Sequence, residues 1–173
     1  MTPTVCLRSP ELSDITFLYE WENDTSIWHL GSVSAPLSRF MLEQYIINSS
    51  DDIYVSRQVR FMIDHVRKGK SVKTVGAIDL FDFDPKNMRA GVGILISNGE
   101  RKKGLALAGL KALLSYAFEV VGMKQVWAGI PAGNMSSLKL FEEAGFTRSG
   151  IRKEWIKRGE GWEDEYIYQL IRK

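Results

Sequence analysis

Residues 98–106, NGERKKGLA, constrain the fold more than any other part of the chain. They join an apolar segment, residues 92–96, to a long segment with helical periodicity. In that segment apolar residues recur at positions i, i+3, i+4, i+7, i+8 and i+11: Leu110, Leu113, Leu114, Ala117, Phe118 and Val121. Gly122 follows, and glycine commonly ends a helix in the left-handed conformation. The pattern predicts a buried strand, a tight basic turn and an amphipathic helix.

A strand-to-helix turn of this composition is a place where phosphates bind. The start of the helix offers unpaired backbone N–H groups and the positive end of the helix dipole. Arg101, Lys102 and Lys103 add charged donors, and Gly104 lets the backbone approach an anion closely. The residues alone leave two interpretations open, a phosphate site and a basic, solvated loop before a core helix. The turn lacks the Gly-Lys-Ser/Thr ending of a P-loop and the Gly-x-Gly-x-x-Gly dinucleotide fingerprint.

The composition excludes several other classes of protein. The 173 residues suit a single domain spanning positions 1–173. With 23 Lys and Arg against 21 Asp and Glu, bulk charge favours neither nucleic-acid nor membrane binding. The apolar runs are shorter than a bilayer span and no signal peptide is evident, so we expect a cytoplasmic protein. Cys6 is the single cysteine, and His29 and His65 show no ligand spacing, so we expect no metal site.

The rest of the chain predicts strands and helices around this centre. The first half reads as a strand at 5–8, a helix capped by Asp14, and a second helix beginning near Ser38. A loop at 25–35 contains Trp28 and His29, which could serve a substrate pocket or simple packing. Three antiparallel strands follow at 58–64, 73–81 and 89–96, the first of them half-buried.

The second half predicts three further elements after the main helix. A strand at 125–130 should run parallel, at least in part, to the strand before that helix. Asn134 or Ser136 caps a short helix at 137–144, and residues 151–157 and 163–171 form a closing hairpin. The order β-α-α-β-β-β-α-β-α-β-β predicts an α/β domain, a mixed sheet with helices on both faces.

The motifs in this order resemble those of the GCN5-related N-acetyltransferases, the GNAT superfamily. Residues 101–106, RKKGLA, match the family signature Arg/Gln-x-x-Gly-x-Gly/Ala, and residues 91–96 are similar to the strand that precedes it. Residues 134–146, NMSSLKLFEEAGF, resemble the family helix that opens Asn-x-x-Ser and ends Gly-Phe. The opening Leu7-Arg8 with residues 20–24, and the ending 161–164, are similar to the RimJ/RimL branch and to spermidine acetyltransferases. The resemblance covers essentially the whole chain.

The resemblance implies a GNAT-type fold, mostly antiparallel with one splayed parallel strand pair, and acetyl-CoA as co-substrate. The pantetheine arm would lie between the splayed strands, bonded to the backbone of residues 94–96, and Asn134 would hold it. Ser137 and Lys139 would lie near the cofactor. The acceptor would be a small-molecule or peptidic amine, and a homodimer through the closing hairpin is a further expectation. The residues expected to bind acetyl-CoA are Ile94, Leu95, Ile96, Arg101, Lys102, Lys103, Gly104, Leu105, Ala106, Asn134 and Ser137.

The implied reaction is direct attack of an amine on the acetyl thioester. Because an alkyl amine has a pKa of about 10, a general base must remove a proton at neutral pH. Asp79 is the first candidate, at a position where spermidine acetyltransferases carry a glutamate; the alternative is that Asp79, Asp82 and Asp84 form an acidic, solvated strand end. Glu22 and Glu160 are further candidates. A backbone N–H near Leu95 or Ile96 would stabilise the thioester oxygen.

One position departs from the family pattern. Many relatives carry a tyrosine that protonates the leaving thiolate, and here that position is Phe141, which has no proton to donate. Ser137 or a water could replace it, or the thiolate could leave unprotonated, since a thiol pKa is about 8.5. The competing functions are an acetyl-CoA-binding module with little activity and a nucleotide-binding domain of another class. Polyamines, protein N-termini and other small amines all stay open as acceptors.

Overall fold

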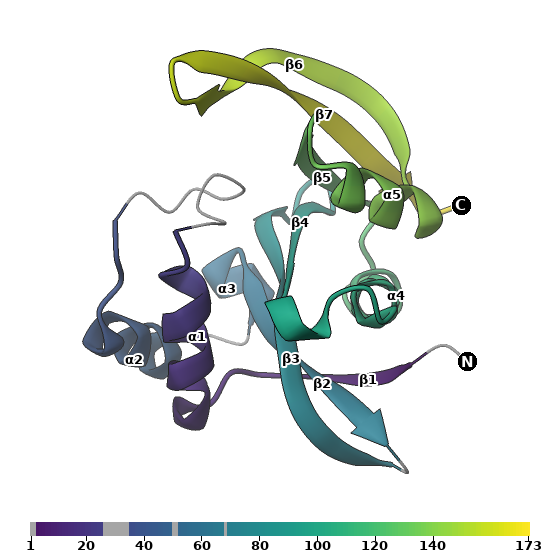
Figure 1. The fold of residues 1–173 in the computed structure, drawn as a ribbon. Helices are drawn as coiled ribbons and strands as arrows, with labels where there is room; N and C mark the ends of the chain where they lie inside the picture. Colours follow the sequence, from purple (N-terminus) through teal and green to yellow (C-terminus); the bar gives the residue numbers. More distant parts are fainter. Residues whose placement is uncertain (1–2, 26–34, 50–51, 68) are drawn as a thin grey trace.

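The computed structural model describes residues 3–25, 35–49, 52–67 and 69–173 (Figure 1). Its centre is a seven-stranded sheet in the order β1-β2-β3-β4-β5-β7-β6. The strands are β1 Thr4–Arg8, β2 Val59–Arg67, β3 Lys70–Asp84, β4 Arg89–Ile96, β5 Gln125–Pro131, β6 Thr147–Arg158 and β7 Gly161–Ile171. β4 and β5 are parallel, and the other neighbouring pairs are antiparallel. This confirms the mixed α/β sheet expected from the sequence.

Helices cover both faces of the first four strands (Figure 1). The helices are α1 Ile15–Glu22, α2 Arg39–Asn48, α3 Ile53–Ser56, α4 Leu105–Ser115 and α5 Met135–Glu143. Leu18 of α1 and Leu42 of α2 pack on Met62 and Ala77, whereas α4 packs on the opposite face. The short helix α3 was not expected; Asp52 begins it by accepting a hydrogen bond from the Tyr54 N–H at 2.8 Å.

Burial on both faces corrects the expectation of a half-buried strand at 58–64. Met62 and Ile63 are adjacent, so their side chains point to opposite faces, yet both are fully buried. The sequence alternation reflects only Arg60 and Asp64, which are polar but engaged in ion pairs. A strand in the middle of a two-sided core needs no solvent-facing side.

The predicted main helix is confirmed, with one difference at its end. Leu110, Leu113 and Ala117 are fully buried, as their spacing indicated. A π-helical turn, Tyr116–Val120, continues α4, and the Val121 N–H donates to the Tyr116 carbonyl at 3.1 Å. Gly122 then ends the segment at φ +77°. Hydrophobic spacing predicts a helix but does not distinguish α from π hydrogen bonding over a single turn.

Asp14 precedes α1 as expected, but its side chain does not cap that helix. Its carboxylate accepts two hydrogen bonds from Arg8, at 2.7 and 2.8 Å, and one from the Glu11 N–H at 2.8 Å. Arg8 also donates to Asp64 at 2.9 Å, and Thr74 completes the group. The charged donors of Arg8 outcompete a neutral helix N–H for this buried carboxylate. The group ties β1, β2 and β3 to the start of α1.

The end of the chain forms the expected hairpin, which is longer than the sequence indicated. β7 pairs with both β5 and β6, so the last strand of the chain lies inside the sheet and β6 at its edge. α5 begins one residue after Asn134, whose Oδ1 accepts the Ser137 N–H at 3.2 Å. Among the described residues, no helix is long and apolar enough to cross a membrane.

Candidate active site

The site begins where the parallel strands β4 and β5 separate. Within the described residues these strands pair only from Arg89–Gln125 to Gly91–Trp127. Beyond this point β4 continues beside β3, while β5 continues beside β7. Ile94, Leu95 and Ile96 line the gap that opens. Their backbone groups on the β5 side can bind an extended ligand as a neighbouring strand would.

The basic turn and the start of α4 lie at one end of this gap. Lys102 and Gly104 both have positive φ, +61° and +75°, and Gly104 is the residue before α4. The Arg101 Nε donates to the Ile96 carbonyl at 3.0 Å, which ties the turn to the end of β4. The first N–H groups of α4 and the exposed cations around them could hold an anion such as a phosphate.

Glu100, which the sequence analysis did not single out, also lines the cleft at this end. Its carboxylate binds Lys73 at 2.8 Å and Lys103 at 3.0 Å. The hydrogen bonds from Lys73 and Lys103 lower the pKa of Glu100 to about 2. The sequence gives no signal that Glu100 pairs with Lys73, because only the pairing of β3 with β4 brings these two residues together.

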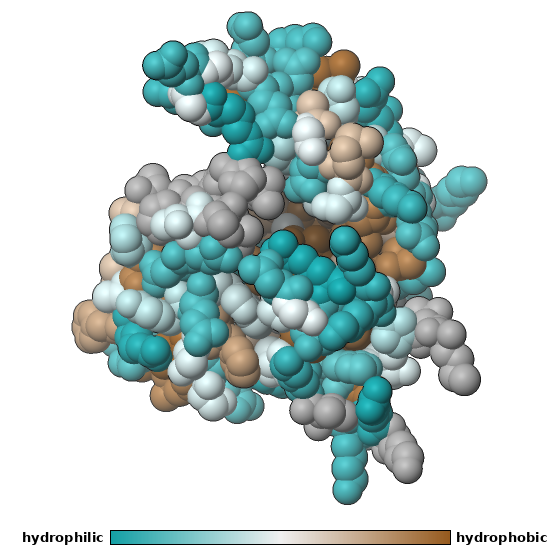
Figure 2. All heavy atoms as spheres, viewed as in Figure 1, coloured by the Kyte–Doolittle hydropathy of each residue, from teal (hydrophilic) through white to brown (hydrophobic). Residues whose placement is uncertain are grey.

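A single cleft of about 710 Å³ joins these features and continues past them. In Figure 2 an apolar recess lies between hydrophilic rims at the centre of the view. The cleft contains eleven of the twelve predicted site residues: Asp79, Ile94, Leu95, Ile96, Arg101, Lys102, Gly104, Leu105, Ala106, Asn134 and Ser137. Lys103 is outside this lining in the part of the chain that the structure describes.

Three charged side chains occupy the end of the cleft away from the turn. Arg60 of β2 donates to Asp79 of β3 from Nε at 2.7 Å and from Nη2 at 3.0 Å. Its Nη1 donates to Glu22, the last residue of α1, at 2.7 Å. The three side chains are 21–28% exposed, and all of them line the cleft. The group carries one positive and two negative charges, hence a net charge of −1.

Arg60 keeps its charge in this position. Desolvation alone would lower the pKa of Arg60, but the charge and hydrogen bonds of Asp79, followed by the charge of Glu22, outweigh it and raise that pKa. Both carboxylates were predicted from the sequence as candidate bases, whereas Arg60 was not. Only the strand register places Arg60 directly across from Asp79.

Phe141 does not enter the cleft. Its ring is 3% exposed and packs edge-to-face on Phe146, with the ring centroids 4.9 Å apart. Among the described residues that line the cleft from α5 are Ser136, Ser137 and Lys139. The family position of the tyrosine is therefore occupied by a core residue. Two serines line the cleft beside Asn134: the Ser136 hydroxyl donates to the Asn134 Oδ1 at 3.0 Å, and the Ser137 backbone N–H donates to the same oxygen at 3.2 Å.

Other candidates lie elsewhere or outside the described residues. Asp84 organises the β3–β4 turn by accepting from the Lys86 and Asn87 N–H groups. Glu160 is at the exposed tip of the closing hairpin, outside the described lining of the cleft. Trp28 and His29 fall outside the described residues. Within the described residues, no three His, Cys, Asp or Glu side chains cluster as a metal site would need.

Comparison with known proteins agrees with this geometry. A family model described as the acetyltransferase (GNAT) domain matches residues 4–147. The uncharacterized N-acetyltransferase p20 of Bacillus licheniformis is 22% identical over 99% of this chain and 95% of its own. The probable N-acetyltransferase YjcK of Bacillus subtilis is 22% identical over 78% of this chain and 82% of its own.

Solved structures show the same fold. The spermidine N-acetyltransferase of Vibrio cholerae, in complex with CoA and spermine, superposes with a TM-score of 0.85 at 21% identity, covering 97% of this chain and 95% of that one. The same enzyme in a dodecameric structure gives a TM-score of 0.78 at 22% identity, covering 97% and 94%.

The splayed parallel strands, the basic turn and the cleft agree with the family model and the N-acetyltransferase relatives, which show that the protein is an acyltransferase. With the family match over most of its length, the chain belongs to the GNAT superfamily of N-acetyltransferases.

Proposed function

We propose that the protein transfers the acetyl group of acetyl-CoA to a small, cationic amine. The observation that carries this proposal is the continuity of one cleft between a basic turn and a net negative cluster. A coenzyme with phosphates suits the first end and an ammonium group suits the second. The two substrates would then meet between them, beside Ile94, Leu95 and Ile96.

The residues at the coenzyme end fit acetyl-CoA. The pyrophosphate would bind the N–H groups of residues 104–106 and the cations Arg101 and Lys102, with Lys103 adding positive charge nearby. The pantetheine arm would hydrogen-bond to the free edge of β4, and Asn134 would face it from the start of α5. An N–H of Leu95 or Ile96 would donate to the thioester oxygen as negative charge develops there.

The acceptor end supplies the proton chemistry. Asp79 would take a proton from the ammonium group, directly or through a water, so that the amine nitrogen can attack the acetyl carbon. The new C–N bond forms as the C–S bond breaks. The nitrogen must then lose its second proton, and Ser137, or a water that Ser137 holds, would relay a proton to the departing CoA thiolate as this one is released. Arg60 and Glu22 would lie beside the reacting groups as a fixed ion pair.

A small cationic acceptor is supported by the charge of the cluster and by the spermine bound in the Vibrio cholerae enzyme. A peptide N-terminus is the second candidate acceptor, and it would bring less positive charge to the site.

We also propose that the chain self-associates. The dodecameric neighbour and the exposed Trp155 and Trp162 on the closing hairpin support this, and light scattering after gel filtration measures it.

A thiol-release assay tests the proposed reaction. Acetyl-CoA is supplied with spermidine, with a simple alkylamine and with a short peptide bearing a free N-terminus. We expect the highest kcat/KM for spermidine, and a fall of about a hundredfold or more in kcat for Asp79→Asn. Asp82→Asn, at an exposed carboxylate three residues further along β3, is the matched control. If the protein binds CoA but releases no thiol with any amine, it is a CoA-binding module and not an acetyltransferase.

A further inference from the structure

We propose that Arg60 is a positioning residue that sets both the geometry and the charge of the acceptor end of the cleft. It would aim Asp79 at the reacting amine and cancel one of the two negative charges that face a cationic acceptor. The inference rests on the proposed function for the identity of the reaction. The arrangement of the three side chains is independent of it.

The geometry gives Arg60 this role. Its planar guanidinium meets both oxygens of Asp79 and one oxygen of Glu22, with distances of 2.7 to 3.0 Å. A two-point contact fixes the plane of a carboxylate, which a single hydrogen bond does not. Asp79 therefore faces the cleft in one orientation. The same guanidinium joins the end of α1 to the sheet.

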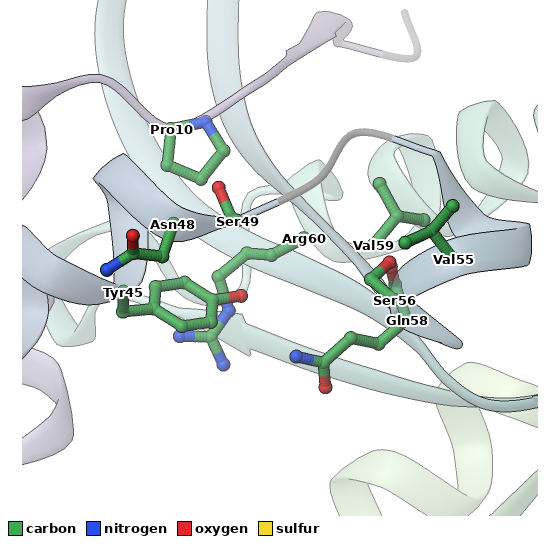
Figure 3. Close-up of a pocket in the computed structure, with 9 residues that line it drawn as sticks. All are labelled: Pro10, Tyr45, Asn48, Ser49, Val55, Ser56, Gln58, Val59 and Arg60. Atoms are coloured by element: carbon green, nitrogen blue, oxygen red, sulfur yellow. The ribbon is translucent and has the colours of Figure 1, made fainter.

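A further contact restricts the rotation of the Arg60 side chain. The Tyr45 ring of α2 lies against the guanidinium, with 5.6 Å from its carbon to the ring centroid. Arg60 and Tyr45 also line a second pocket of about 280 Å³, next to Gln58 (Figure 3). Burial raises the pKa of Tyr45, the Arg60 charge opposes this, and the carboxylates of Asp79 and Glu22 add to it, so the phenol stays neutral. The guanidinium thus lines both cavities, and contacts on both sides fix its position.

The charges lead to an unusual expectation. Replacing Arg60 by a neutral residue changes the cluster from −1 to −2, so an incoming ammonium group is attracted more strongly. Replacing Glu22 by a neutral residue changes the cluster from −1 to 0 and weakens that attraction. A residue with only a structural role would weaken binding when removed, whereas the removal of Arg60 should strengthen it.

The experiment compares wild type with Arg60→Gln, Arg60→Lys and Glu22→Gln. Calorimetry measures the Kd of spermidine in the presence of CoA, and the thiol-release assay measures kcat and KM. For a unit charge about 7 Å away in a half-exposed site, we expect spermidine to bind about threefold to sevenfold more tightly to Arg60→Gln. Glu22→Gln should bind it more weakly by a similar factor. The kcat of Arg60→Gln should fall about tenfold or more, because Asp79 loses its orientation.

Arg60→Lys separates charge from geometry. It keeps the positive charge but not the planar fork, so its spermidine affinity should stay near that of wild type while kcat falls. Arg89→Gln removes one positive charge outside the cleft and should change neither quantity. CoA affinity and thermal unfolding, measured for each variant, show that the fold and the coenzyme end are intact.

The two proposals fail separately. If spermidine affinity does not rise on removal of Arg60, including the case of no binding to any variant, the positioning role is overturned. If wild type fails to release thiol with every amine tested while the affinities change as expected, acetyl transfer is refuted, and only the role of Arg60 in setting the charge of the acceptor end holds. A fall of both affinity and stability in Arg60→Gln would make Arg60 a purely structural residue.

Discussion

Gly93 of β4 lies directly across from Asp79 of β3, and a Cβ built on Gly93 would lie 3.8 Å from the Asp79 Oδ2. It would also lie 3.7 Å from the Phe81 ring. A single methyl group therefore fits at this position, and anything larger must extend into the cleft in front of the carboxylate. The missing side chain leaves the space in which an amine would approach Asp79.

Gly93→Val is expected to block the acceptor without disturbing the coenzyme. Valine suits a strand, so the fold should persist, but its two methyl groups would occupy the space beside Asp79. We expect kcat/KM for spermidine to fall about tenfold or more and the Kd of CoA to stay within about twofold. Gly93→Ala is the matched control and should retain most activity. Equal losses in both variants would show that the effect arises from backbone strain.

Glu100→Gln is expected to tighten CoA binding. The Glu100 carboxylate engages Lys103 and Lys73 and lines the proposed phosphate end of the cleft, so it would compete with the CoA phosphates for these cations. Removing its charge should lower the Kd of CoA about threefold at low salt, with a smaller effect at high salt. Glu119→Gln, an exposed carboxylate beyond the end of α4, serves as control. Weaker CoA binding would mean that Glu100 acts mainly by ordering the turn.

Arg8→Gln is expected to destabilise the fold. It would leave Asp14 and Asp64, whose side chains are 3% and 7% exposed, without their cation. Breaking such a buried pair from one side costs about 3–5 kcal/mol. Urea unfolding of the variant measures this change in the free energy of unfolding. A loss below about 1 kcal/mol would contradict the structural role of the Arg8 cluster.

The same cluster predicts how stability depends on acid. Burial by itself raises the pKa of Asp14, but the hydrogen bonds from Arg8 and the Glu11 N–H and the charge of Arg8 outweigh it, and the pKa is lowered from 3.8. A lowered folded-state pKa gives stability that is present above the unfolded value and is lost as pH falls through the folded value. In Asp14→Asn, the free energy of unfolding should be lower at neutral pH and should fall less steeply below about pH 4. An unchanged acid limb would contradict this assignment.

Phe141→Tyr is expected to leave the thiol-release rate unchanged. The ring packs on Phe146 in the core, so an added hydroxyl would be buried there without reaching the cleft. A buried hydroxyl without a partner costs about 1–3 kcal/mol of stability, which thermal unfolding detects. A rise in kcat with no loss of stability would show instead that this position reaches the departing thiol.

Much of the architecture followed from local sequence patterns. The spacing of apolar residues predicted α4, and the Asn134 cap with Gly145 predicted the ends of α5 to within a residue or two. The basic turn before α4 made an anion site one of two interpretations, because glycine beside cations at a helix start is short-range chemistry that a solvated loop shares. In contrast α3 was missed, since four residues carry too little periodicity to indicate a helix.

The sequence by itself determined the order of the elements, the basic turn and the resemblance that indicated the fold, because all three rest on residues close together in the chain. Only the tertiary structure decided which charges meet. Arg60 lies 19 positions from Asp79 and 38 from Glu22, and strand register together with the end of α1 brings the three side chains to one end of the cleft. Burial and pairing of charges depend on these long-range contacts, which no local pattern specifies.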